Sequence, residues 1–118
     1  MSLDTLPEIS LAELTQSLRS MNPPVVAEIL GPQYFARGHL PGALNLPLEG
    51  LAERAAQLLP DKRASLVVYC ASSTCQNSDI AQRKLRSLGY QDVRVFKGGK
   101  AAWQEAGLTL EAPASLAG

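Results

Sequence analysis

The sequence predicts an α/β fold in which a mostly parallel sheet is covered by helices on both faces. Short apolar runs alternate along the chain with segments whose apolar residues repeat at helical spacing. The run at 66–70 (LVVYC) has no polar face, which is typical of a central parallel strand buried on both sides. Ligand sites of such sheets lie outside the carboxyl ends of the strands, and Cys70 stands at one of these ends.

Glycine and proline residues divide the first half of the chain into elements. Ser10 and Glu13 have the spacing of a capping box, which predicts a helix that ends before Pro23. Pro41 and Gly42 suit the two central positions of a type II turn. The remaining elements predicted here are a strand at 25–30, a short helix at 32–37, a strand at 43–46 and a helix over 48–59.

The second half continues the alternation of strands and helices. A polar stretch at 71–77 follows the central strand and precedes a helix that carries Ala81, Leu85 and Leu88. Gly89 supplies the left-handed residue that ends this helix. A strand at 92–96 and a short helix bearing Trp103, which we expect to pack beneath that helix, complete the prediction.

Length and charge restrict the class of protein. The 118 residues suit one domain, 1–118, with a core at about 8–110. Eleven basic residues balance eleven acidic ones, which argues against a nucleic acid or an anionic membrane as partner. No apolar run approaches the roughly 20 residues of a membrane span. Residues 1–7 lack the pattern of a signal peptide, so we expect a cytoplasmic protein.

Cys70 is the candidate nucleophile. A free cysteine has a pKa near 8.5, and amides of a tight loop together with the N-terminus of a helix would favour its thiolate. The alternative is an inert apolar cysteine at the end of a core strand. Small and hydroxyl side chains prevail in the candidate binding loop, which consists of Ala71, Ser72, Ser73, Thr74, Cys75, Gln76, Asn77 and Ser78.

Three segments together resemble the single-domain rhodanese family of sulfurtransferases. The segment 38–43 (GHLPGA) is similar to a signature of the family, and 67–70 (VVYC) is similar to the strand that delivers its catalytic cysteine. The third segment combines Gly89-Tyr90, Val93, Gly98-Gly99 and Trp103. The resemblance covers residues 8–110 and implies a rhodanese-like fold with a five-stranded, mostly parallel sheet.

The resemblance also implies a chemistry. The Cys70 thiolate would take sulfur from a small donor, thiosulfate or a persulfide, and pass it from a Cys70 persulfide to a thiol or cyanide. A protein of a sulfur relay would be a further partner. No cofactor and no metal is expected, because Cys70, Cys75 and His39 are too few and wrongly spaced for zinc.

The chain departs from the family pattern in three places. Its loop after Cys70 is longer than usual, and no Arg or Lys occurs between Cys70 and Asp79 to bind an anionic donor. The family's Asp-x-Arg reads Glu28-Ile29-Leu30 here, so Leu30 replaces the Arg. We expect Glu28 to be satisfied by Arg37 or by backbone amides.

Other polar residues near these motifs have competing interpretations. Cys75 is either a resolving thiol for Cys70 or a small loop residue. His39 adjoins the Pro-Gly turn, which favours a structural role. Lys97 and Lys100 flank the Gly-Gly pair, and we expect both to be solvated rather than to supply positive potential to the site.

Two other functions compete with sulfur transfer. One is a thiol redox sensor or a non-catalytic interaction module that uses the Cys70/Cys75 pair. The other is a phosphatase or arsenate reductase, whose loop wants an Arg to bind the oxyanion. The loop has Gln76 six positions after Cys70, which counts against the second alternative.

Overall fold

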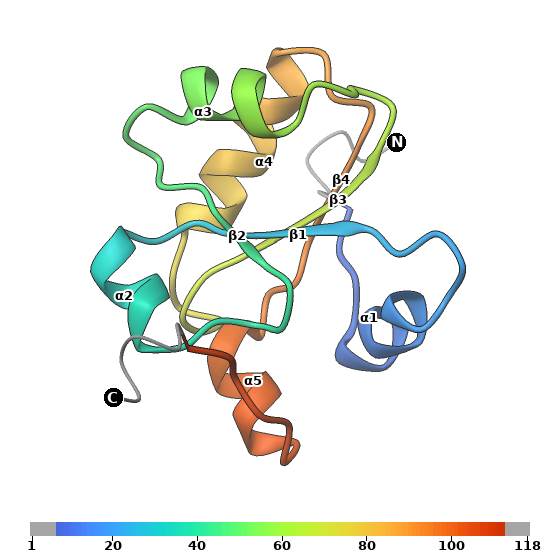
Figure 1. Ribbon diagram of the computed structural model, residues 1–118, viewed down its shortest axis with the longest axis vertical. Helices are drawn as coiled ribbons and strands as arrows, with labels where there is room; N and C mark the ends of the chain where they lie inside the picture. Colours follow the sequence, from blue (N-terminus) through green and yellow to red (C-terminus); the bar gives the residue numbers. More distant parts are fainter. Residues whose placement is uncertain (1–6, 113–118) are drawn as a thin grey trace.

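The computed structural model describes residues 7–112 and contains four parallel strands in one sheet, in the order β2-β1-β3-β4 (Figure 1). The strands are β1 (Val25–Glu28), β2 (Leu44–Asn45), β3 (Ser65–Tyr69) and β4 (Asp92–Val95). The helices are α1 (Leu11–Leu18), α2 (Pro32–Arg37), α3 (Leu51–Leu58), α4 (Asn77–Ser87) and α5 (Gly99–Glu105). The predicted α/β class and the alternation of elements are confirmed.

The expectation of five strands is wrong for the described residues. At the free edge of β4, the N-terminal segment makes only a single parallel bridge, between Glu8 and Val95. Pro7 has no amide to extend this bridge, and Ser10 already caps α1, so the chain leaves the sheet edge after one residue. Residues 1–6, on which the prediction of no signal peptide largely rests, lie outside the described part of the chain.

Both faces of the sheet are covered, as predicted. Helices α3 and α4 lie on one face, and α1 and α5 lie on the other (Figure 1). Alternate residues of β3 serve the two cores: Val68 packs with the α3 and α4 side, whereas Val67 and Tyr69 pack with the α1 and α5 side. The central strand is therefore apolar on both faces, which is why its sequence shows no polar alternation.

Several predicted boundaries are confirmed and others are shifted, and the strands predicted at 25–30 and 43–46 are shorter. The capping box of Ser10 and Glu13 is formed, and Gly42 takes the left-handed conformation of the turn at φ 76°. Helix α3 begins after Gly50, so Leu48 precedes it. Helix α4 begins at Asn77. Two residues assigned to the binding loop, Asn77 and Ser78, therefore belong to the first turn of this helix. Among the described residues, no helix is both long and apolar enough to cross a bilayer.

Candidate active site

Cys70 lies where the sequence predicts, directly after β3 at the carboxyl edge of the sheet. Tyr69, the last residue of β3, is in register with Glu28, the last residue of β1, so the two strand ends lie side by side. The chain then turns through residues 71–76 into α4. Cys70 is almost fully buried, with 2% of its surface exposed, while Ala71, Ser73 and Thr74 are exposed.

Helix α5 fixes the start of this loop. The amides of Lys100 and Ala101 donate to the carbonyl oxygens of Cys70 and Ala71, at 3.1 and 2.9 Å. Gly99 makes this approach possible, because it adopts φ +59° and a β-carbon there would overlap the carbonyl oxygen of Cys70. In the sequence, Gly99 is recognisable only as part of the Gly-Gly motif. The second glycine of Gly98-Gly99 therefore permits the close approach of the two backbones.

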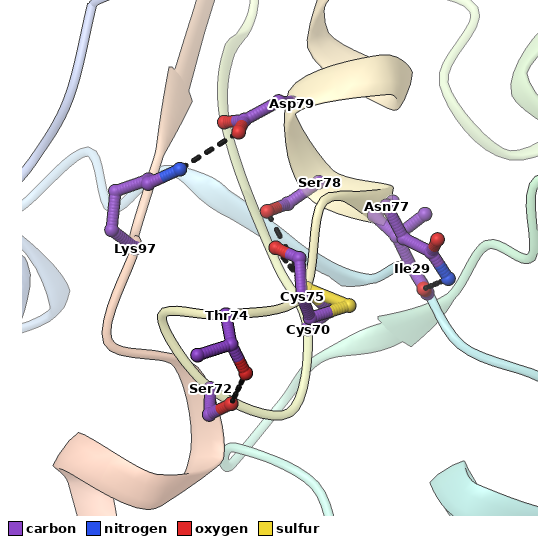
Figure 2. Close-up of a disulfide and its surroundings, with 9 residues drawn as sticks. All are labelled: Ile29, Cys70, Ser72, Thr74, Cys75, Asn77, Ser78, Asp79 and Lys97. Carbon is purple, nitrogen blue, oxygen red and sulfur yellow. Dashed lines mark hydrogen bonds and ion pairs between the residues drawn. A yellow bond between two sulfur atoms is a disulfide. The ribbon is translucent and has the colours of Figure 1, made fainter.

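The loop closes on itself through a disulfide between Cys70 and Cys75, whose Cα atoms are 6.3 Å apart (Figure 2). A turn supports this closure, since the amide of Cys75 donates to the carbonyl of Ser72 at 3.1 Å. The Cys70 sulfur also lies 3.4 Å from the carbonyl oxygen of Cys75 and 3.6 Å from the hydroxyl of Ser78. The structure therefore brings Cys75 and Ser78 to the candidate nucleophile.

The side chains of the other predicted loop residues make no hydrogen bond to the sulfur among the described residues. The hydroxyls of Ser72 and Thr74 bond to each other at 3.0 Å (Figure 2). Asn77 donates to the carbonyl of Ile29 and ties the start of α4 to β1, and Gln76 is exposed. The main-chain amides of residues 71–74 have no acceptor among residues 7–112. Contacts of these amides with a Cys70 thiolate stay a prediction for the reduced loop.

Glu28 lies beside the site and is fully buried. The hydroxyl of Tyr69 donates to Oε1 of Glu28 at 2.8 Å and accepts from the amide of Leu40 at 3.0 Å. Lys100 places its Nζ 3.0 Å from Oε2, which is an ion pair outside the angles of a well-aligned hydrogen bond. Burial, more than the neighbouring Glu28, raises the pKa of Tyr69 far above its usual value, so this hydroxyl stays protonated and donates.

Two expectations about charged residues are corrected here. Glu28 is paired with Lys100 and Tyr69, and neither Arg37 nor a backbone amide takes the place of the missing family Arg. The lysines that flank the Gly-Gly pair are not simply solvated. Lys100 has 14% of its side chain exposed, and Lys97 lies 2.7 Å from Asp79 in the first turn of α4 (Figure 2). In the sequence, the only sign of the ion pair between Lys100 and Glu28 is that a lysine directly follows Gly99.

The structural role predicted for His39 is confirmed by its contacts. Its Nδ1 lies 3.0 Å from the carbonyl of Phe35, and because a carbonyl only accepts, this nitrogen carries the proton. The ring stacks on that of Phe35 at 3.8 Å between centroids. The backbone of His39 exchanges two 2.8 Å hydrogen bonds with Glu111. Trp103 is buried among core residues, also as predicted, and donates to the carbonyl of Thr109.

Comparisons with known proteins agree with this architecture. Residues 10–106 match the family model described as a rhodanese-like domain. The chain is 32% identical to a sulfurtransferase from Allochromatium vinosum over 90% of this chain and 95% of the relative. It is also 32% identical to the thiosulfate sulfurtransferase GlpE from Shewanella oneidensis, over 88% and 98% of the two chains.

Solved structures give the same result. The crystal structure of the Alr3790 protein from Anabaena sp. superposes with a TM-score of 0.80 at 30% identity, over 88% of this chain and 91% of that one. Two other relatives are longer: the chain spans 44% of the HTH-type transcriptional regulator Rv0324 from Mycobacterium tuberculosis and 65% of the uncharacterized protein slr1261 from Synechocystis sp.. With this extent of agreement in sequence and in fold, the chain belongs to the rhodanese-like domain family.

Proposed function

We propose that this chain is a sulfurtransferase in which Cys70 carries the transferred sulfur as a persulfide. The observation that carries the proposal is the place of Cys70, at the carboxyl end of the central strand and at the start of a loop that leads into α4. In α/β sheets this edge is where ligands bind. The relatives from Allochromatium vinosum and Shewanella oneidensis are both named sulfurtransferases.

The reduced loop offers donors for an anionic sulfur. The amides of residues 71–74 have no acceptor within residues 7–112, and α4 adds the positive end of its dipole. Oriented amides and a helix N-terminus are the surroundings in which reactive cysteines are held as thiolates. The same donors would hold the negative charge of the persulfide in the second half of the reaction.

Two displacements complete the proposed cycle. The Cys70 thiolate attacks the outer sulfur of thiosulfate, a bond forms between the two sulfurs, and sulfite leaves with the electron pair of the broken bond. An acceptor, cyanide or a thiol, then attacks the outer sulfur of the persulfide and Cys70 leaves as thiolate. Thiosulfate appears in the name of one relative. In this chain, residues 71–78 contain no Arg or Lys that could bind it.

The test is a thiosulfate–cyanide assay on the reduced Cys75→Ser chain, in which the disulfide that blocks Cys70 cannot form. Thiocyanate should form with parallel lines in double-reciprocal plots, because the donor leaves before the acceptor binds. Cys70→Ser should abolish the product. A Cys70→Ser chain that still produces thiocyanate at the rate of the Cys75→Ser chain would overturn the proposal.

A further inference from the structure

The disulfide gives the candidate nucleophile a second partner from its own loop. Cys75 is held near Cys70 by the turn that joins its amide to Ser72, and the 6.3 Å between the two Cα atoms lies within the span of ordinary disulfides. Figure 2 shows the two sulfurs joined beside Ser78. No segment distant in sequence is needed for this closure, since only five positions separate the cysteines.

Closure removes Cys70 from reaction. With the loop closed, 2% of its surface is exposed and its sulfur is bonded to Cys75, so no donor can be attacked. Cys75 itself is partly exposed, and it is followed by the exposed Gln76. The site therefore has two states, an open dithiol that takes up sulfur and a closed disulfide that does not.

We propose that Cys75 resolves the Cys70 persulfide and releases its outer sulfur as hydrosulfide, which makes the site a dithiol-linked reductase of sulfane sulfur. The inference rests on the proposed function, because it needs the persulfide. In the step, the Cys75 sulfur bonds to the Cys70 sulfur and the bond to the outer sulfur breaks. The outer sulfur leaves with that electron pair and takes the proton of the Cys75 thiol. The two cysteines are oxidised, and the sulfane sulfur is reduced to HS⁻.

The closed structure favours attack on the inner sulfur. Attack on the outer sulfur would move the persulfide to Cys75 and leave Cys70 as a free thiolate. The partner that Cys75 has in the structure is the Cys70 sulfur itself, which is the inner sulfur of a Cys70 persulfide. Ser78 lies 3.6 Å from this sulfur and offers a hydroxyl near the bond that breaks.

A reductant of the dithiol class would reopen the loop. Its thiolate meets Cys75 first, because Cys75 is the more exposed of the two cysteines. Cys70 then leaves as the thiolate that the free loop amides favour, and a thiol of low pKa is the better leaving group. The second thiol of the reductant releases Cys75, so that the reductant ends as a disulfide and both cysteines end as thiols.

A single-turnover experiment without added thiol tests the inference. The natural chain, Cys75→Ser and Cys75→Ala are reduced, freed of reductant without oxygen, and mixed with thiosulfate. Sulfide is measured per chain, and the intact mass is recorded. The natural chain should release one sulfide per chain and end as the disulfide, two hydrogens lighter than the reduced form. Both variants should release none and retain the mass of one sulfur.

The outcomes separate the inference from the proposed function. If the natural chain keeps the added sulfur and releases no more sulfide than the variants, or if the sulfur is found on Cys75, resolution on the inner sulfur is overturned while the persulfide stands. If the Cys75 variants, shown to be folded by circular dichroism, take up no sulfur, the proposed function fails and the inference fails with it.

Discussion

The carboxyl ends of the neighbouring strands β1 and β3 are built in opposite ways. Glu28, at the end of β1, is held by residues 41 and 72 positions away in sequence, Tyr69 and Lys100. Cys70, at the end of β3, has side-chain partners only five and eight positions away, within its loop and the first turn of α4. The first arrangement joins distant elements, and the second is confined to one loop and the first turn of the helix that follows it.

This difference separates stability from reactivity. Breaking a buried network that ties several elements together costs stability everywhere, whereas opening a short surface loop costs little. We therefore expect substitutions at the end of β1 to change the free energy of unfolding and substitutions in the loop to change sulfur chemistry. The following predictions test that division, from the largest expected effect on stability to the smallest.

The largest effect is expected from Lys100→Met. It leaves the fully buried Glu28 carboxylate without its cation, and removal of one partner from a buried pair costs about 3–5 kcal/mol. The matched control is Lys97→Met, which breaks a more exposed pair with Asp79 and should cost at most about 1 kcal/mol. Urea denaturation of both variants measures the two costs. Equal losses would mean that the buried pair of Lys100 and Glu28 stabilises the fold no more than an exposed pair does.

Gly99→Ala should weaken both regions together, because Gly99 contacts the backbone of Cys70 and directly precedes Lys100, the partner of Glu28. The left-handed φ costs about 1–3 kcal/mol for a residue with a side chain, and the overlap with the Cys70 carbonyl adds to it. Gly107→Ala is the control, since Gly107 has φ +83° and open space around its β-carbon position. A lower free energy of unfolding and a lower thiocyanate rate than in the control are expected. Equal stability in both variants would show that the close approach is unimportant.

Tyr69→Phe should cost about 1–3 kcal/mol, because the amide of Leu40 and the Glu28 carboxylate each lose a hydrogen-bond partner in the core. The effect depends on pH in a defined direction. The pKa of Tyr69 is raised in the fold, so its contribution is full below the pKa of about 10 that tyrosine has in the unfolded chain and is lost as pH rises above it. The stability of the variant should fall less between neutral and alkaline pH. An equal fall in both chains would contradict this role of Tyr69.

The smallest effect is expected from Ser10→Ala, which removes the exposed N-cap of α1 and should cost about 1 kcal/mol. Hydrogen bonds from the amide and the hydroxyl of Ser10 also lower the pKa of Glu13, so the contribution of this carboxylate is present at neutral pH and is lost as pH falls through its folded pKa. Thiocyanate formation should be unchanged. A slower rate would mean that α1 acts on the distant loop.

Elements with local sequence signals were predictable, and contacts between distant residues were not. Pro32, Gly42, Gly89 and the Ser10 capping box act within a few residues, and each has the predicted effect. The prediction of a fifth strand was wrong, because pairing at the edge of the sheet depends on where the neighbouring helix α1 begins. The predicted partner of Glu28 was also wrong, because the sequence pattern alone does not say that Lys100 in α5 lies beside the end of β1. The five-residue spacing left two interpretations of Cys75 open, and in the structure it is paired with Cys70.

The most direct test of the account is the position of transferred sulfur on the chain. Reduced Cys75→Ser protein, in which resolution is blocked, is mixed with thiosulfate or with a small-molecule persulfide and digested for peptide mass analysis. The mass of one added sulfur is expected on the peptide that contains Cys70, and none in the Cys70→Ser chain. An unmodified Cys70 in folded protein, or sulfur retained by Cys70→Ser, would contradict it.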